Sequence, residues 1–402
     1  MKLLQIDTCL GTGSTGRITE SIAQLAINNH WDCYIIHGAR YVRHPSCMID
    51  IQSVSKIGEY IHYVEGLLFD DHGLASRRAT RRVINDIRKI SPDIIHLHCI
   101  HGYYLNYKIL FNYLNSLDIP IVWTFHDCWA FTGHCAHFVT AACEKWKSGC
   151  YSCPRKSSYP KAIVDKSKRN YDLKKKLFIA NNNLHIVPVS NWLADLTRES
   201  FFKAKDIRVI RNGVDLTIFK PLNVVKEKKR FRILGVSGVW TKSKGLEDFI
   251  LLRDVLSNEL FDIVMVGLNR EQISSLPEGI IGIEHTDSIE ELAILYNSSD
   301  VFFNPTYADT FPTVNLEALA CGTPVITYKT GGSPEAVSSD TGWVVNQGDL
   351  TSVIELIKKM SELSKEEIRI LRTNCRKRAM DEFDKTHCFE KYLALYNELI
   401  KQ

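Results

Sequence analysis

The chain has 402 residues, of which 45% are hydrophobic and 24% charged, a composition typical of a globular protein. Because domains usually contain about 100–200 residues, this length predicts two domains. The sequence has no run of about 18 uncharged apolar residues, and Asp7 interrupts its first apolar stretch, so we expect neither a membrane span nor a secretory signal. A formal charge of +4 is too small to indicate nucleic-acid binding. The sequence thus predicts a cytoplasmic protein.

Basic residues are concentrated in two groups, one with helical spacing and one a lysine-rich run. A solvated helix face and a polar linker would explain both groups. The alternative is peripheral contact with the inner face of an anionic membrane, where each nearby Lys or Arg adds about 1 kcal/mol. The groups are Arg77, Arg78, Arg81, Arg82, Arg88 and Lys89, and then Lys226, Lys228, Lys229, Arg230 and Arg232.

Apolar runs of strand length alternate with helical patterns in both halves of the chain. The runs are apolar on both faces, which is typical of parallel strands covered by helices on each side. The expected strands are 2–8, 33–38, 94–100, 120–126 and 185–190, then 231–237, 261–267, 280–285, 301–306 and 324–328, with helices at 14–30, 289–297 and 313–321. The segment 211–230 is the expected linker. We therefore expect an α/β fold of two doubly wound domains that bind ligands outside the carboxyl ends of their strands.

A glycine-rich turn (residues 11–16) follows the first expected strand. It reads Gly-Thr-Gly-Ser-Thr-Gly, a pattern that lets backbone N–H groups approach a diphosphate at a helix N-terminus. The second strand ends without the Asp or Glu that holds a ribose in dinucleotide-binding proteins. Three interpretations stay open: NAD(P), another phosphate-bearing ligand, or a tight turn alone.

Two carboxylates lie near the start of the expected helix at 313–321. Asp309 lies in the loop after a strand and Glu317 one turn inside the helix, so both can face one ligand at the helix N-terminus. Carboxylates accept hydrogen bonds from sugar hydroxyls, and N–H groups in the segment 311–313 would meet phosphate or sugar oxygens. Taken singly, Asp309 is also explained as a loop or N-cap carboxylate, and Glu317 as an exposed helix residue.

The spacing of these two acids resembles the E-x7-E motif of glycosyltransferase family 4. Seven residues separate Asp309 from Glu317, and Ala-Leu-Ala-x-Gly-x-Pro-Val-Ile follows. Other markers of the family occur in the same order along the chain, at 13–17, 210–215, 244–245 and 331–335. The segment 123–129 and the cysteines after it are similar to bacterial colanic-acid and capsular polysaccharide transferases.

This resemblance implies a GT-B fold, with two Rossmann-like domains facing a central cleft. The N-terminal, acceptor-side domain would span residues 1–212, joined by a C-terminal helix at 386–402, and the nucleotide-sugar domain would span 213–385. The implied activity is that of a retaining hexosyltransferase in surface polysaccharide biosynthesis that needs no catalytic metal. Its donor would be a UDP- or GDP-sugar, and its acceptor a polysaccharide or lipid-linked glycan.

The resemblance also implies roles for single residues, carried over by position. Glu317 would bind the ribose hydroxyls, and Asp309 the hydroxyls of the donor sugar. Lys244, with Lys242, would neutralise the departing diphosphate, and His126 would lie near the anomeric carbon and the acceptor. The catalytic residues would be His126, Lys244 and Asp309, and the donor-binding residues Gly13, Ser14, Thr15, Gly16, Lys242, Phe311, Pro312, Thr313 and Glu317.

The chain departs from the family pattern at two places. Asp309 replaces a Glu and is one methylene shorter, which changes its reach to the sugar. Gly238-Val239 stands where the family has an Arg before the lysine. Lys242 is the expected substitute, although a lysine lacks the bidentate fork of an arginine.

Histidines follow two expected strands of the first half. His126 is explained either as a site residue or as a packed histidine with a satisfied hydrogen bond. His96 and His98 share one strand face without an obvious third metal ligand. We therefore expect them, with His101, to line the cleft or contact the acceptor.

Five cysteines cluster between residues 128 and 153, and four of them have the spacing of a structural zinc site. Cys135, Cys143, Cys150 and Cys153 include one C-x2-C pair. Four thiolates would close a zinc tetrahedron and hold an irregular loop in place. Free thiols and disulfides are the alternatives.

Two other classes of function stay open from the sequence. An NAD-dependent or nucleotide-sugar-modifying enzyme, such as a dehydrogenase or epimerase, can be built on the same sheets. A non-catalytic sugar-binding scaffold would show no turnover. Titration with NAD(P)H distinguishes the first class, and a donor-hydrolysis assay distinguishes the second.

Overall fold

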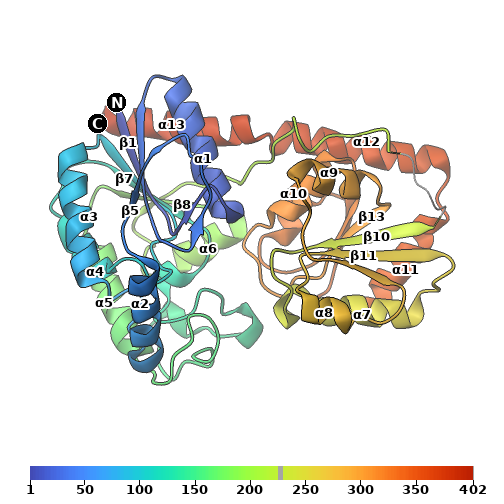
Figure 1. The fold of residues 1–402 in the computed structure, drawn as a ribbon, viewed down its shortest axis with the longest axis horizontal. Coiled ribbons are helices and arrows are strands. Elements are labelled where there is room, and N and C mark those ends of the chain that lie inside the picture. The colour runs from blue at the N-terminus through green and yellow to red at the C-terminus, as the bar shows by residue number, and fades with distance from the viewer. Residues whose placement is uncertain (225–229, 402) are drawn as a thin grey trace. The chain divides into compact units, whose positions relative to one another are not determined.

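The computed structural model describes residues 1–224 and 230–401, and the chain forms two compact units (Figure 1). The first unit is Met1–Arg211 with Phe389–Gln402, and the second is Asn212–Cys388. Each unit is built on one parallel sheet, as the alternation of apolar runs predicts. Lys226, Lys228 and Lys229 of the lysine-rich run lie outside the described residues.

The sheet of the first unit has seven strands in the order β5-β3-β1-β6-β7-β8-β9. Its central strands β6 and β7 are buried at every position, because helices cover both faces. The five strands predicted for this half are confirmed, but each ends earlier than expected because the chain turns at polar residues such as Asp7, His98 and His126. The strands are β1 (Lys2–Ile6), β3 (Asp32–His37), β5 (Ile49–Gln52), β6 (Ile94–Leu97), β7 (Ile121–Phe125), β8 (Leu184–Pro188) and β9 (Asp206–Ile207), beside a ribbon of β2 (Cys9–Leu10) and β4 (Tyr41–Val42).

Helices cover both faces of this first sheet. In Figure 1, α3, α4 and α5 lie on one face, and α1 and α13 lie on the other. The rings of Trp31, just before β3, and Tyr396 on α13 approach to 6.0 Å between centroids, so the last helix of the chain packs beside the first strands. The helices are α1 (Gly13–Asn28), α2 (Lys56–Phe69), α3 (Arg77–Ile90), α4 (Tyr107–Leu114), α5 (Ser167–Phe178), α6 (Asn191–Glu199) and α13 (Lys385–Ile400).

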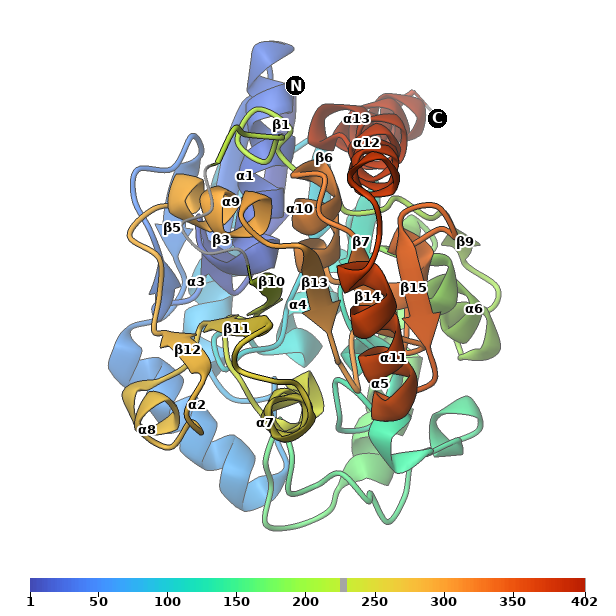
Figure 2. The same ribbon diagram turned by 90° about the vertical axis from the view of Figure 1, so that its right-hand side faces the viewer.

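The sheet of the second unit has six strands, which follow one another from β12 to β15 across Figure 2 in the order β12-β11-β10-β13-β14-β15. Helices α9, α10 and α12 cover one side, and α7, α8 and α11 the other (Figure 1). The strands are β10 (Phe231–Val236), β11 (Phe261–Val266), β12 (Ile280–Ile283), β13 (Val301–Asn304), β14 (Val325–Tyr328) and β15 (Gly342–Val345). The helices are α7 (Leu246–Val255), α8 (Arg270–Ser274), α9 (Ile289–Asn297), α10 (Thr313–Ala320), α11 (Leu350–Ser361) and α12 (Lys365–Glu382).

The first part of the expected linker is packed within the second unit. The backbone N–H of Val214 donates to the carbonyl of Phe383 at 2.8 Å, and that of Lys385 donates to the carbonyl of Val214 at 3.1 Å. The Lys385 ammonium lies 2.6 Å from the Asp215 carboxylate. These contacts hold the segment after residue 211 against the start of α13. Among the described helices, none combines the length and the apolar character that crossing a bilayer requires.

Candidate functional site

The carboxyl edge of the second sheet gathers most of the predicted donor-binding residues. The segment after β10 contains Lys242 and Lys244, and the segment after β13 is an acidic loop (residues 305–312) that contains Asp309. Because parallel strands all end at the same edge, these segments come together there. The edge therefore brings a cation, a carboxylate and the start of α10 into one place.

Lys244 and Asp309 form an ion pair at this edge. The Lys244 Nζ lies 2.6 Å from Asp309 Oδ2, and the two side chains are 35% and 19% exposed. Lys242 instead lies 3.3 Å from Glu247, and its side chain is 84% exposed. The structure thus brings Lys244 and Asp309 together, whereas the Lys242 side chain pairs with Glu247.

The acidic loop is held by hydrogen bonds along its length. The backbone N–H of Tyr307 donates to the carbonyl of Ser243 at 2.8 Å, and the Gln347 amide donates to the carbonyl of Tyr307 at 3.1 Å. The Asn212 amide donates to the carbonyl of Phe311 at 3.3 Å. The loop is therefore fixed from three separate segments of the second unit.

Gly331 also determines the position of the acidic loop. Its φ is +55°, and a Cβ at this position would lie 1.8 Å from the carbonyl oxygen of Asp309. Any side chain would therefore collide with the backbone of the loop, in a conformation that already disfavours other residues. Only glycine permits the observed approach of the 331–335 segment to Asp309.

Helix α10 begins at Thr313, as predicted, and its first turn lacks both a side-chain cap and an acidic residue. Pro312 is the N-cap residue. Glu317 lies one turn further along and is only 5% exposed. Its Oε2 accepts a hydrogen bond from the Tyr296 hydroxyl on α9 at 3.0 Å. Glu317 is thus a fixed, buried carboxylate rather than an exposed helix residue.

A buried polar network fixes the start of α10 against the sheet. The Asn304 amide donates to Asn315 Oδ1 at 2.8 Å, and the Asn315 amide donates to Ser333 Oγ at 2.9 Å. The Thr327 hydroxyl, 2.7 Å from Ser333 Oγ, donates to the carbonyl of Asn304 at 3.0 Å. Buried polar groups that are fully paired in this way hold one arrangement.

The glycine-rich turn lies at the carboxyl edge of the first sheet. Helix α1 starts at Gly13, and its N-cap residue Thr12 makes no side-chain capping bond. Gly11 and Gly13 have φ angles of +60° and +67°, and Ser14 is exposed. The first N–H groups of the helix therefore have neither an intrahelical acceptor nor a side-chain cap from Thr12, which suits an anion. Gly16 is buried against the turn, where a Cβ would lie 3.2 Å from the nitrogen of Gly11.

Two buried carboxylates that the sequence pattern left unassigned, Asp7 and Asp127, follow strands of the first sheet, and Asp7 bonds to Thr15 of this turn. Burial raises the pKa of Asp7 to about 6, against hydrogen bonds from Thr8, Thr15 and Cys99 that lower it. Burial likewise raises the pKa of Asp127, but the charge and hydrogen bond of His101, 2.9 Å away, outweigh it and hold the pKa at about 2. The signal for both carboxylates was a polar residue within two positions of the end of a buried strand.

His126 follows β7 at the same edge. Burial lowers its pKa to about 4, so the ring is neutral near pH 7. Its Nε2 lies 3.1 Å from His98 Nδ1, and both rings line one small pocket with His101. His96 bonds instead to Thr124 at 2.7 Å and to Tyr396 on α13 at 2.6 Å.

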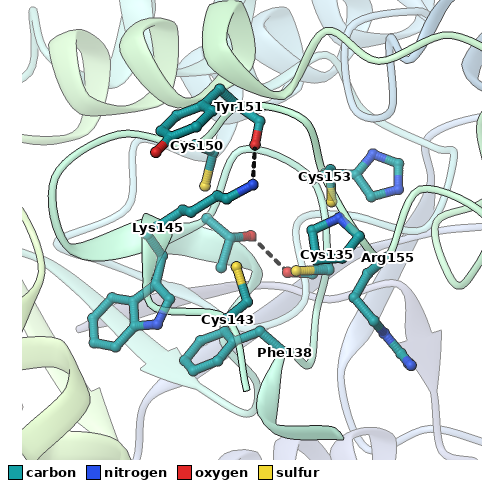
Figure 3. A pocket seen from close by; sticks show the side chains of 12 residues that line it. Cys135, Phe138, Cys143, Lys145, Cys150, Tyr151, Cys153 and Arg155 are labelled. Atoms are coloured by element: carbon teal, nitrogen blue, oxygen red, sulfur yellow. Dashed lines mark hydrogen bonds between the residues drawn. The ribbon is translucent and has the colours of Figure 1, made fainter. Parts of the chain in front are cut away.

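The four predicted zinc ligands line a single pocket in the first unit. Figure 3 shows Cys135, Cys143, Cys150 and Cys153 around this pocket, whose free volume is about 10 Å³. All four are free thiols, and the backbone N–H of Gly133 donates to Cys150 Sγ at 3.1 Å. As placed, no three His, Cys, Asp or Glu side chains of the described residues are arranged to hold a metal ion. A zinc site would require the thiols to close on the pocket, and it stays a prediction.

Comparisons with known proteins agree with this architecture. Residues 35–218 match the family model described as Glycosyltransferase Family 4, and residues 220–381 match the one described as Glycosyl transferases group 1. A putative colanic acid biosynthesis glycosyl transferase of Escherichia coli (strain K12) is 24% identical over 377 residues, which cover 89% of this chain and 90% of that protein. An N,N'-diacetylbacillosaminyl-diphospho-undecaprenol alpha-1,3-N-acetylgalactosaminyltransferase of Campylobacter jejuni is 27% identical over 229 residues, 52% of this chain and 58% of that protein.

Solved structures resemble the chain over its whole length. A glycosyltransferase from Rickettsia africae matches with a TM-score of 0.70 at 17% identity and covers 100% of this chain and 99% of its own. The Anabaena protein HepE, solved with UDP-glucose, matches with a TM-score of 0.65 at 15% identity and covers 99% of this chain and 100% of its own. The chain therefore has the GT-B fold, as the sequence predicted.

Replacing Gly331 by Ala should displace the acidic loop. The added Cβ collides with the Asp309 carbonyl and the backbone is strained at positive φ, which together cost about 2 kcal/mol. We expect the melting temperature to fall by about 5 °C. Gly238→Ala is the matched control, because nothing lies within 4 Å of a Cβ at that position. Equal melting temperatures for the two variants would contradict the close approach.

Metal analysis tests the zinc prediction directly. Protein purified under reducing conditions should contain about one equivalent of zinc, as a closed tetrathiolate site requires. Cys150→Ser should lose the metal, whereas Cys47→Ser, outside the pocket, should keep it. Zinc-free protein that is folded under reducing conditions would refute the site.

Proposed function

Because the chain belongs to the glycosyltransferases that join a family 4 domain to a group 1 domain, we propose that it is a retaining hexosyltransferase with a nucleotide-sugar donor. The acceptor would be a polysaccharide or lipid-linked glycan in surface polysaccharide biosynthesis. The relatives named above support this assignment, since one is assigned to colanic acid biosynthesis and the name of the other contains a diphospho-undecaprenol acceptor. The observation that carries the proposal is the Lys244–Asp309 ion pair beside the uncapped start of α10.

The acidic loop and α10 would hold the donor. The buried Glu317 carboxylate would accept hydrogen bonds from the ribose hydroxyls while Tyr296 keeps it in place. The backbone around Phe311, Pro312 and Thr313 would meet the phosphates at the helix N-terminus, where negative charge is favoured. The donor would be a UDP- or GDP-sugar, in keeping with the UDP-glucose complex of HepE.

Lys244 and Asp309 would exchange partners when the donor binds. The diphosphate would take the Lys244 ammonium, and the hydroxyls of the sugar would take the Asp309 carboxylate. In the reaction, the bond from the anomeric carbon to the diphosphate oxygen breaks, a bond to the acceptor hydroxyl oxygen forms on the same face of the sugar, and the hydroxyl proton leaves with the departing diphosphate. Negative charge then develops on the departing phosphate, and a fixed ammonium stabilises it most in that state.

The first unit would supply the remaining groups. We assign the N–H groups of residues 13–16 to donor phosphates, because the first turn of α1 lacks a cap and an acidic residue. His126 is assigned to the reacting sugar and the acceptor, and Lys242 to the phosphates as a secondary contact.

Substituting the two charged donor ligands tests this assignment. With a donor selected by thermal shift among UDP- and GDP-sugars, Lys244→Ala should lower kcat/KM by about 100-fold or more, because it removes a preorganised charge from the leaving group. Glu317→Ala should cause a loss of similar order, since it removes hydrogen bonds between a carboxylate and the ribose. Nucleoside diphosphate release and NMR of the anomeric proton of the product report turnover and retention.

Matched controls are available on α11, whose Lys358 and Glu355 are exposed. Lys358→Ala and Glu355→Ala should leave kcat/KM unchanged. Near-normal activity in both Lys244→Ala and Glu317→Ala would refute the assignment, and an inverted anomeric configuration would refute retention. A protein that binds the donor yet never releases the diphosphate, even with an acceptor, would be a scaffold.

A surface formed by α2 and α3 suits a membrane-bound acceptor. Helix α2 exposes large apolar side chains, and α3 exposes arginines along a groove of about 840 Å³ between the two helices. We therefore place this α2–α3 surface at an anionic membrane, where apolar side chains enter the interface and arginines attract the headgroups. Its residues are Ile57, Tyr60, Ile61, Leu68 and Phe69 on α2, and Arg77, Arg78, Arg81 and Arg82 on α3.

Liposome sedimentation at low salt tests the α2–α3 surface. The double variant Arg78→Ala/Arg82→Ala should bind anionic vesicles about 30-fold more weakly, because each nearby arginine contributes about 1 kcal/mol. Lys358→Ala/Lys359→Ala on α11 removes the same charge elsewhere and should bind like the wild type. Equal binding of both double variants would exclude this surface.

A further inference from the structure

A row of buried side chains leads from β1 to His126 in the first unit. Gln5 on β1 and His98 directly after β6 are 0% and 2% exposed. His98 Nε2 lies 3.0 Å from Gln5 Oε1, and His98 Nδ1 lies 3.1 Å from His126 Nε2. Each ring nitrogen of His98 therefore has a hydrogen-bond partner. The contacts of Gln5 and the charge of His98 determine which atom donates in each bond.

Gln5 determines the direction of the first hydrogen bond. Its Nε2 donates to the carbonyl of Thr19 at 2.9 Å and lies 3.3 Å from Met48 Sδ. A carbonyl oxygen and a thioether sulfur accept hydrogen bonds but cannot donate them, so the reversed amide would place its oxygen against two acceptors. The Gln5 oxygen therefore faces His98 and accepts, which requires a proton on His98 Nε2.

The charge state of His98 determines the second direction. Burial lowers the pKa of His98 well below its usual value, and the neighbouring His96 and His126 lower it further. A neutral ring with its proton on Nε2 has a lone pair on Nδ1. This lone pair accepts from His126 Nε2, and the two ring planes lie within 19° of parallel. The backbone of His98 is held as well, because the Trp123 indole donates to its carbonyl at 2.9 Å.

We propose that Gln5 and His98 are positioning residues that hold His126 as the tautomer protonated on Nε2, which makes His126 Nδ1 the hydrogen-bond acceptor for a substrate hydroxyl. Both groups act through His126, and neither touches substrate. The role of the hydroxyl rests on the proposed function, whereas the tautomer is a property of the free protein.

The tautomer decides what His126 can do for a sugar or acceptor hydroxyl. A ring with its lone pair on Nδ1 accepts the hydroxyl proton in a hydrogen bond, and the lone pairs of the hydroxyl oxygen then remain available for an electrophilic carbon. The opposite tautomer would donate to that oxygen and occupy one of its lone pairs. The hydrogen bonds that join Gln5, His98 and His126, here called the relay, thus favour a hydroxyl that acts as a nucleophile. No proton moves along the relay.

Nitrogen NMR of the full-length wild type tests the tautomer. In protein with 15N-labelled histidine and no substrate, the signals of His126 are assigned by their loss in His126→Gln. We expect a protonated Nε2 and an unprotonated Nδ1. A proton on Nδ1, or an even mixture of the two forms, would overturn the proposal.

Gln5→Leu tests the origin of the tautomer. Without the Gln5 oxygen, His98 is free to change tautomer, so His126 should show a mixture, and kcat should fall about fivefold with little change in the donor KM. Gln5→Glu should restore the wild-type signals, because a buried, protonated carboxyl can donate to Thr19 and accept from His98. Gln24→Leu makes the same substitution at an exposed position on α1 and should change neither signals nor kcat.

The two readouts separate this proposal from the proposed function. A wild-type tautomer retained in folded Gln5→Leu overturns the relay, whatever the activity. A changed tautomer with unchanged kcat supports the relay and contradicts the role given to His126. If Gln5→Leu does not fold, the wild-type spectrum and Gln5→Glu still decide the assignment.

Discussion

Parallel strands buried on both faces place polar groups that can meet a ligand at the carboxyl edge of the sheet. Strands β6 and β7 in the first unit and β11, β13 and β14 in the second are buried at every position. An unpaired charge within these strands would lie in a dry core at high cost, and Asp262 on β11 is accordingly paired with Arg230 and Arg232. Asp7, His126, Lys244 and Asp309 all follow a strand, so the polar groups of the proposed site lie at the carboxyl edges of the two sheets.

The groups at these edges are fixed because buried polar atoms need partners. Tyr296 holds Glu317, Ser333 holds Asn315, and Gln5 holds His98, each within 3.0 Å. Every one of these bonds joins two different elements, so the edge cannot rearrange without leaving a buried group unpaired. In the proposed function, such preorganisation would let a few polar side chains act on a charged leaving group without first reorienting.

The periodicity of the sequence predicted the strands, and the spacing of Asp309 and Glu317 around a helix start predicted the acidic edge. Both are local signals, and local patterns determine local structure. The pairing of Lys244 with Asp309 and of Glu317 with Tyr296 joins residues 65 and 21 positions apart, and only packing sets such contacts. The sequence could not predict that Lys242 pairs with Glu247 instead of Asp309, since Lys242 and Lys244 lie in one short turn and look alike in sequence. The exposed apolar face of α2 depends on which side of the helix the sheet leaves uncovered.

Under the proposed function, the ion pair of Lys244 and Asp309 would let the shorter acid of this chain take the role that the resemblance implies. An aspartate reaches less far than a glutamate, yet here its carboxylate already meets the lysine at 2.6 Å, at the place where sugar and phosphate would join. A partly exposed pair of this kind contributes about 1 kcal/mol, so a donor that offers hydroxyls to one partner and phosphates to the other displaces it at little cost. Each of the two side chains would then have a hydrogen-bonding partner before and after binding. The Lys244–Asp309 pair thus leaves neither charge without a partner in the free protein. It is also weak enough that a donor could displace it.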